Sequence, residues 1–398
     1  MSEWKKVNLG DCCEITSSKR IFFSEYVESG IPFYRSKEII EKGKGEGISH
    51  PLYISKEKYD EIKGKYGVPQ KRDLLLTAVG SLGIPFVVKD DSPFYFKDGN
   101  LVWLKHFQDI DPIFLYYWIK SENGYNALYN IAIGSAQKAL TIAAIKGYEI
   151  PLPPLQTQHR IANILSRYDS LIENYQKQIK LLEEAAQRLY KEWFVDLHFP
   201  GYENTKIVDG VPEGWKKKSI GEIGEYLNGF AFKPSDWQDL GKPIIKIKEM
   251  GNGVTNETPR NSGERVPAKY LIKAGDLLFS WSATLMVIIW SGEEGWLNQH
   301  LFKVTPVKGI DREFLLQSIS NTIVEFQNLT TGSTMKHIQR NKLDQVFVNV
   351  PNAEIMKRYS DISEKTRSNI LSLQSQLRLL TEARNRLLPK LMSGAIIH

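Results

Sequence analysis

Residues 151–193 read PLPPLQTQHRIANILSRYDSLIENYQKQIKLLEEAAQRLYKEW, and this stretch determines the architecture of the whole chain. Its prolines end any preceding helix, because proline lacks a backbone donor and restricts the residue before it. From Ile161 onward, apolar residues recur at alternating steps of four and three with no glycine or proline between them. This spacing predicts a long helix that pairs with another helix along a narrow seam. The expected seam residues are Ile161, Leu165, Tyr168, Ile172, Tyr175, Ile179, Leu182 and Leu189.

A second, weaker copy of this pattern lies 198 residues further along the chain. Ser363, Thr366 and Arg384 interrupt its apolar series. A helix of roughly 35–40 residues would span about 50–60 Å, which exceeds the needs of an ordinary globular core. Two readings stay open: the helices pair with each other, or each packs on its own domain. Related units associate about a two-fold axis, which permits parallel or antiparallel helices. The second set of expected seam residues is Ile370, Leu373, Leu377, Leu380 and Leu387.

The sequence before each helix is also repeated. Trp4-Lys5-Lys6 returns as Trp215-Lys216-Lys217, and Ile31–Glu38 is echoed by Lys242–Glu249. The separation between matched blocks drifts from 211 to 198 residues in unbroken order, as duplication followed by changes in loop length would leave it. The repeat is too long for a solenoid unit, so it predicts two whole domains. Further matched blocks are Arg72–Thr77 with Gly275–Ser280, Asp111–Leu115 with Asp311–Leu315, and Gly134–Lys138 with Gly332–Lys336.

The predicted fold class is α/β (α+β), with two similar globular domains that are each followed by a long helix. Short β-branched and aromatic runs separated by turn residues indicate strands, with occasional helical stretches between them. The expected segments are a first domain at 1–152, a central helix at 153–197, a linker at 198–213, a second domain at 214–352 and a C-terminal helix at 353–393.

Composition excludes several classes of function. The two cysteines are adjacent, and the seven histidines show no metal-ligand spacing, so neither a disulfide framework nor a metal site is expected. No phosphate-binding glycine loop or nucleophile elbow occurs. We therefore expect a cytoplasmic chain with no membrane segment, no bound metal and no catalytic residues. The one enzymatic alternative is a metal-dependent nuclease that uses Glu61 and Lys63.

The chain resembles the specificity subunits of type I restriction-modification enzymes along its whole length. The resemblance rests on Pro151–Gln158 followed by Ile161–Leu165, on the Gly-Ser pairs at Gly134 and Gly332, and on Val211–Trp215 at the start of the second half. In the second half, Val350–Ala353 departs from the Pro-Leu-Pro-Pro-Leu pattern.

The resemblance implies a non-catalytic subunit that recognises DNA. Each domain would bind one half of a split double-stranded target, and the antiparallel helices would set the gap with pseudo-two-fold symmetry. Two methyltransferase subunits would supply adenine methylation with S-adenosylmethionine, and a motor-nuclease subunit would use ATP and Mg²⁺. No cofactor is then expected in this chain. The alternative from a different class is a coiled-coil scaffold without a nucleic-acid role.

Candidate DNA contacts are polar residues near turns, preferably at equivalent places in both repeats. Arg, Lys, Asn and Gln read base edges best, whereas phosphates accept any basic or amide donor. Glycine permits a close backbone approach to phosphate. The formal net charge of +6 arises mostly from the C-terminal helix, so binding would depend on local basic faces. The first-domain candidates are Lys19, Arg20, Arg35, Lys37, Gly134, Ser135, Gln137 and Lys138; those of the second domain are Lys233, Lys246, Lys248, Gly332, Ser333, Lys336, His337 and Arg340.

Overall fold

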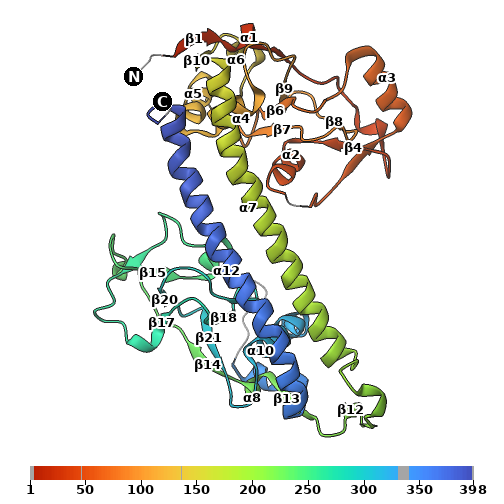
Figure 1. Cartoon of the computed structure of the whole chain (residues 1–398), viewed down its shortest axis with the longest axis vertical. Coiled ribbons are helices and arrows are strands. Elements are labelled where there is room, and N and C mark those ends of the chain that lie inside the picture. Colours follow the sequence, from red (N-terminus) through yellow and green to blue (C-terminus); the bar gives the residue numbers. More distant parts are fainter. Residues whose placement is uncertain (1–3, 46, 136, 330–339, 397–398) are drawn as a thin grey trace. The chain divides into compact units, whose positions relative to one another are not determined.

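The computed structural model of the chain describes residues 4–45, 47–135, 137–329 and 340–396 (Figure 1). It divides into two units, one formed by Met1–Asn174 with Leu379–His398 and the other by Tyr175–Arg378. Each unit therefore holds one domain and part of each of two long helices, α7 (Leu155–Tyr190) and α12 (Ala353–Met392). The predicted class, two similar α/β domains each followed by a long helix, is confirmed.

Two four-stranded sheets form the first domain. One is antiparallel, in the order β2-β9-β6-β7; the other has the order β3-β5-β4-β8, in which β4 and β8 run parallel. A separate antiparallel pair, β1-β10, leads into α7. The strands are β1 (Lys5–Asn8), β2 (Glu14–Thr16), β3 (Tyr26–Val27), β4 (Ile31–Tyr34), β5 (Leu52–Ile54), β6 (Leu74–Thr77), β7 (Pro85–Val87), β8 (Tyr95–Phe96), β9 (Leu101–Lys105) and β10 (Glu149–Leu152). The helices are α1 (Leu9–Cys12), α2 (Ser36–Gly43), α3 (Lys56–Tyr66), α4 (Pro112–Lys120), α5 (Glu122–Ile131) and α6 (Ile142–Lys146).

The second domain repeats the antiparallel sheet of the first domain and the parallel strand pair of its mixed sheet, but the outer strand β17 pairs with β20, whereas the outer strand β3 of the first domain pairs with β5. Its antiparallel sheet has the order β14-β21-β18-β19, and its mixed sheet, β16-β15-β20-β17, again contains one parallel pair, β15-β20. The pair β13-β22 corresponds to β1-β10 and leads into α12. The strands are β11 (Ile207–Val208), β12 (Val211–Pro212), β13 (Lys216–Ser219), β14 (Gly224–Asn228), β15 (Lys242–Ile245), β16 (Arg260–Asn261), β17 (Leu271–Ile272), β18 (Leu277–Ser280), β19 (Met286–Ile289), β20 (Gly295–Leu297), β21 (Leu301–Pro306) and β22 (Phe347–Val350). The helices are α8 (Ile220–Ile223), α9 (Ile247–Asn252), α10 (Arg312–Asn321) and α11 (Ile323–Asn328).

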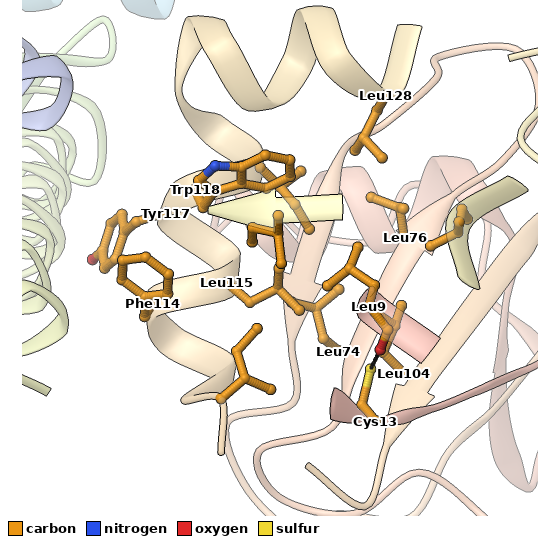
Figure 2. Packing of buried hydrophobic residues seen from close by; sticks show 14 of the residues in the cluster. Leu9, Cys13, Leu74, Leu76, Leu104, Phe114, Leu115, Tyr117, Trp118 and Leu128 are labelled. Carbon is orange, nitrogen blue, oxygen red and sulfur yellow. Dashed lines mark hydrogen bonds between the residues drawn. The ribbon is translucent and has the colours of Figure 1, made fainter. Parts of the chain in front are cut away.

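The core of the first domain lies between its antiparallel sheet and α4 (Figure 2). Asp111 begins α4 by accepting hydrogen bonds from two backbone N–H groups, and Pro112 follows where its missing donor costs nothing. Phe114 and Leu115 are fully buried against strand residues such as Leu74. An aspartate cap also begins α10, at Asp311.

Both cysteines belong to this core. Burial raises the pKa of the Cys13 thiol to about 12, and Cys13 Sγ donates to the Leu9 carbonyl at 3.5 Å (Figure 2). Because the thiolate is the reactive form, we expect neither Cys12 nor Cys13 to react with a thiol reagent at pH 8 in the folded protein. Both should react after unfolding in urea, and rapid labelling of the folded chain would contradict this.

Within each unit the two long helices run antiparallel. In the first unit, the start of α7 shares a buried cluster with the end of α12, where Leu165 and Leu391 are members. In the second unit, the end of α7 shares a cluster with the start of α12, where Trp193 and Tyr359 lie 6.0 Å apart between ring centroids. These contacts show that α7 and α12 are antiparallel, which the spacing of the apolar residues had left open.

All the predicted seam residues of both helices are buried or half-buried. The polar interruptions of the second series have structural roles. Arg384 Nη1 lies 2.8 Å from Asp169 Oδ1 on α7, and Asp169 Oδ2 also accepts a hydrogen bond from Tyr117 on α4 at 2.7 Å. Buried Ser363 donates to the capping carboxylate of Asp311 at 3.3 Å. These polar contacts attach each domain to its helices.

The segment expected as a linker, 198–213, is not simply an exposed connection. A π-helical turn (Lys191–Val195) follows α7, and the hairpin β11-β12 forms further along. Phe199 is buried and packs against Trp215 with the ring centroids 4.6 Å apart, because apolar burial outweighs the polar character of the surrounding residues. Across the described ranges, no helix combines the length and apolar character needed to span a membrane.

Candidate nucleic-acid interface

The mixed sheet brings two first-domain candidates to one edge. Arg35 directly follows β4, whose Tyr34 lies opposite Phe96 of the parallel strand β8. Arg20 Nε lies 2.9 Å from Asp98, two residues after β8, and its side chain is 70% exposed. Neighbouring Lys19 places its ammonium 4.6 Å from the centre of the Tyr66 ring.

Arg35 is held by a buried carboxylate. The Glu38 side chain is fully buried; it accepts hydrogen bonds from the Arg35 backbone N–H at 2.8 Å and from the guanidinium Nε at 3.1 Å. Burial by itself would raise the pKa of Glu38, but the hydrogen bonds from Arg35 outweigh it and hold that pKa below its usual range. Arg35 still keeps 38% of its side chain exposed. Lys37 lies on the outer face of α2 and pairs weakly with Glu41 at 3.7 Å.

The second domain repeats the backbone hydrogen bond of this arrangement at Lys246, without the side-chain ion pair. Buried Glu249 accepts from the Lys246 backbone N–H at 3.1 Å, at the junction of β15 and α9. The Lys246 ammonium lies 4.4 Å from the centre of the Trp237 ring. Lys248 is exposed and pairs with Glu257 at 3.4 Å. Lys233 begins the short 3₁₀ turn before Trp237.

The Gly-Ser block of the first domain forms a tight hairpin after α5. Ile133 and Ala139 exchange two backbone hydrogen bonds across it. Gly134 has φ +105°, and an added Cβ would lie 2.4 Å from the Gln137 carbonyl oxygen, so glycine is required there. Lys138 places its ammonium 3.6 Å from the centre of the exposed Tyr129 ring. Ser135 and Gln137 are exposed at the tip.

Backbone hydrogen bonds connect this hairpin to the Arg35 region. The Asn100 carbonyl accepts from the Ser36 hydroxyl at 3.3 Å and from the Ala78 N–H at 2.8 Å. The Ala78 carbonyl in turn accepts from Leu140, at the end of the hairpin. A chain of three hydrogen bonds thus links Ser36, the residue after Arg35, to Leu140 at the end of the Gly-Ser hairpin.

The remaining candidates are less informative. Arg340 is exposed at the start of a 3₁₀ turn (Arg340–Gln345). Gly332, Ser333, Lys336 and His337 lie outside the described residues, so the second Gly-Ser block is not placed.

The residues of the nuclease alternative lie on the surface of α3. Glu61 pairs with Lys65 at 2.9 Å and with Lys58 at 3.5 Å, and Lys63 is exposed. In the described part of the chain, no three His, Cys, Asp or Glu side chains gather in a group that could hold a metal ion. The structure gives this alternative no supporting geometry.

Sequence reasoning missed an aromatic residue beside a candidate cation and the equivalent aromatic residue of the first repeat. Trp237, whose ring lies near the Lys246 ammonium, is 48% exposed. Tyr26 occupies the equivalent position in the first repeat, 211 residues earlier. It also missed the buried partners Glu38 and Glu249, although both lie in matched blocks. The constant separation of 211 residues from 22–38 to 233–249 was the signal that could have identified them.

Comparisons with known proteins agree with this architecture. The family model for the type I restriction modification DNA specificity domain matches residues 1–184 and 212–378. The MjaIX specificity subunit of Methanocaldococcus jannaschii is 25% identical over 304 residues, which cover 71% of this chain and 68% of the relative. The HindI specificity subunit of Haemophilus influenzae is 23% identical, with both chains covered completely.

Structural comparison supports the same fold. The crystal structure of the type I restriction-modification S subunit from M. genitalium superposes with a TM-score of 0.63 at 17% sequence identity, covering 98% of this chain and 96% of that one. The family matches occupy both repeats, which is the arrangement of a subunit with two target recognition domains. The chain therefore belongs to the type I restriction-modification DNA specificity family, as a specificity subunit.

Proposed function

We propose that this chain recognises a bipartite double-stranded DNA target, with one half-site bound by each domain. The observation that carries the proposal is the occurrence of two similar α/β domains in a chain whose two halves both match the DNA specificity family. Two similar DNA-binding domains joined by long helices fit a target in which two half-sites are separated by a gap of unspecified sequence. Such half-sites must keep a defined helical phase, as dimeric DNA readers require.

The chemistry would then come from other subunits. We propose that methyltransferase subunits, two per chain, and a motor-nuclease subunit assemble with this chain and carry S-adenosylmethionine, ATP and Mg²⁺. This chain would contribute recognition without a cofactor or catalytic residues of its own. The surface ion pairs of Glu61 support this reading over the nuclease alternative.

Methylome sequencing tests the proposal. The chain would be produced in a methylase-free host together with a candidate methyltransferase subunit from the same source genome, and adenine methylation would be mapped across the host genome. The expected result is one split motif with an unspecified gap, absent when either protein is omitted. Methylation or DNA cleavage by the purified chain alone would refute the proposal, and so would a motif without a gap.

A further inference from the structure

Residues 22–38 and 233–249 are the parts of the two repeats in which capped turns and charged residues are most closely matched. Each copy starts with a 3₁₀ turn whose first N–H donates to an acidic side chain three residues later: Phe22 to Glu25 at 2.8 Å, and Lys233 to Asp236 at 2.7 Å. The separation of 211 residues is constant along the segment, so no loop change has occurred within it.

Each turn leads to an aromatic residue that stands nine positions before a cation. In the second domain these are Trp237 and Lys246, whose ammonium is 4.4 Å from the ring centre. In the first domain they are Tyr26 and Arg35. There the Arg35 guanidinium donates to Glu38 through Nε at 3.1 Å, and Tyr26 occupies the position that Trp237 has in the second repeat.

Each cation also has a buried acidic residue three positions later. Glu38 is fully buried and Glu249 is 2% exposed. Both accept a hydrogen bond from the backbone N–H of the cationic residue, at 2.8 and 3.1 Å. Thr258 adds a hydroxyl donor to Glu249 at 3.3 Å. Burying a carboxylate is energetically unfavourable unless it is hydrogen-bonded. Both copies keep such a buried carboxylate, and its hydrogen bond fixes the backbone of the cationic residue.

On the basis of the proposed function, we infer that Lys246, restrained by Trp237, and Arg35, at the equivalent position of the first repeat, contact the DNA phosphate backbone, and that Glu249 and Glu38 are positioning residues for them. The two half-sites of a split target differ in base sequence but share the same sugar-phosphate backbone. Residues that read bases should therefore differ between the repeats, whereas residues that contact phosphates can stay the same.

The chemistry of Lys246 beside Trp237 fits contact with a phosphate better than contact with a base. A lysine ammonium acts as a point charge toward phosphate oxygens, whereas base edges are read best by bidentate side chains. The aromatic ring restrains the ammonium without neutralising it, because the cation–π attraction leaves its outward N–H groups available. At neighbouring positions the repeats do differ: Ala78 corresponds to Trp281, and Asn100 to His300. Base reading is expected from the exposed polar residues at such differing positions, not from Ala78, which is buried.

Lys246→Ala in the full-length chain tests the inference. The probe is a random-sequence DNA duplex, and binding is followed by fluorescence anisotropy across a series of salt concentrations. We expect binding at low salt to weaken about three- to tenfold, and the slope of log affinity against log salt to become shallower by about 1. Coproduced with the methyltransferase, the variant should methylate the same motif as wild type, only less completely.

Lys269→Ala is the matched control. Lys269 also lies over an aromatic ring of the second domain, Tyr270 at 5.1 Å, but it has no counterpart in the first repeat. The control should bind within about twofold of wild type with an unchanged salt slope. Equal behaviour of the two variants would overturn the inference, and so would a methylated motif that loses a base in the Lys246→Ala variant.

Two Glu249 variants test the positioning role. Glu249→Gln keeps an oxygen for the Lys246 N–H and should bind within about twofold of wild type, whereas Glu249→Leu should bind as weakly as Lys246→Ala. If Glu249→Leu does not fold, the comparison of the Lys246→Ala and Lys269→Ala variants still tests the inference. Failure of the wild-type chain to bind any duplex, alone or with the methyltransferase, would refute the proposed function and this inference together. Normal wild-type binding with an indifferent Lys246→Ala variant would refute the inference alone.

Discussion

Insertion of one heptad into both α7 and α12 is expected to abolish methylation at the original target, and any target that is methylated instead should have a longer gap. Seven residues add about 10 Å to a helix, and at 3.4 Å per base pair this corresponds to about three base pairs. Suitable sites are the exposed positions after Asn174 and after Arg378. A whole heptad keeps the apolar seam on the same face of each helix. Methylome sequencing would read the new gap directly.

Insertions at other places provide the controls. Seven residues added after exposed Glu203, in the 3₁₀ turn (Tyr202–Asn204) between the halves, should leave the motif and its gap unchanged. A heptad added to α7 alone would displace one side of the seam against the other, and loss of all methylation is expected. An unchanged gap after insertion into both helices would show that the helices do not set the spacing.

Phe314→Ala should produce the largest loss of stability in the second unit. Phe314 is fully buried on α10, where its ring centre lies 4.9 Å from that of Phe194, 5.6 Å from Tyr190 and 6.4 Å from Tyr359. It thus joins the domain to the end of α7 and the start of α12. Truncation of such a side chain costs about 3–5 kcal/mol, a large part of the usual 5–15 kcal/mol stability of a domain.

Calorimetry and urea unfolding would measure this effect. The transition of the second unit should move to lower temperature and lower urea, whereas that of the first unit should stay in place. The matched control is Phe347→Ala, because Phe347 is 48% exposed; its loss should change the free energy of unfolding by less than about 1 kcal/mol. Equal destabilisation by the two substitutions would show that the aromatic cluster does not stabilise this unit.

Polar contacts account for the weaker apolar series of the second long helix, α12, compared with that of α7. At the position where the first helix has Leu165, the second has Ser363, which bonds to Asp311. Where the first has Ala186, the second has Arg384, which pairs with Asp169. Each polar residue replaces apolar seam packing with a directed contact. Polar residues at such seam positions are known to favour one register over others, at some cost in stability.

The sequence by itself determined the order domain, helix, domain, helix, and the residues of the apolar seam. Hydrophobic periodicity and turn residues act over a few neighbouring positions, and the duplication supplied a second copy against which each element could be checked. It also located the basic residues at the end of β4 and of β15, because both belong to matched blocks. It could not tell which of them are restrained by other side chains.

Only the tertiary structure decided the direction of helix pairing, the parallel strand pairs and the surroundings of the candidate cations. These depend on contacts between residues far apart in the chain: Asp169 and Arg384 are separated by 215 positions, and Arg20 and Asp98 by 78. Glu38 and Glu249 look like ordinary surface charges in the sequence. Their burial, which makes them positioning residues, comes from packing around the β4-α2 and β15-α9 junctions, and no local pattern records it.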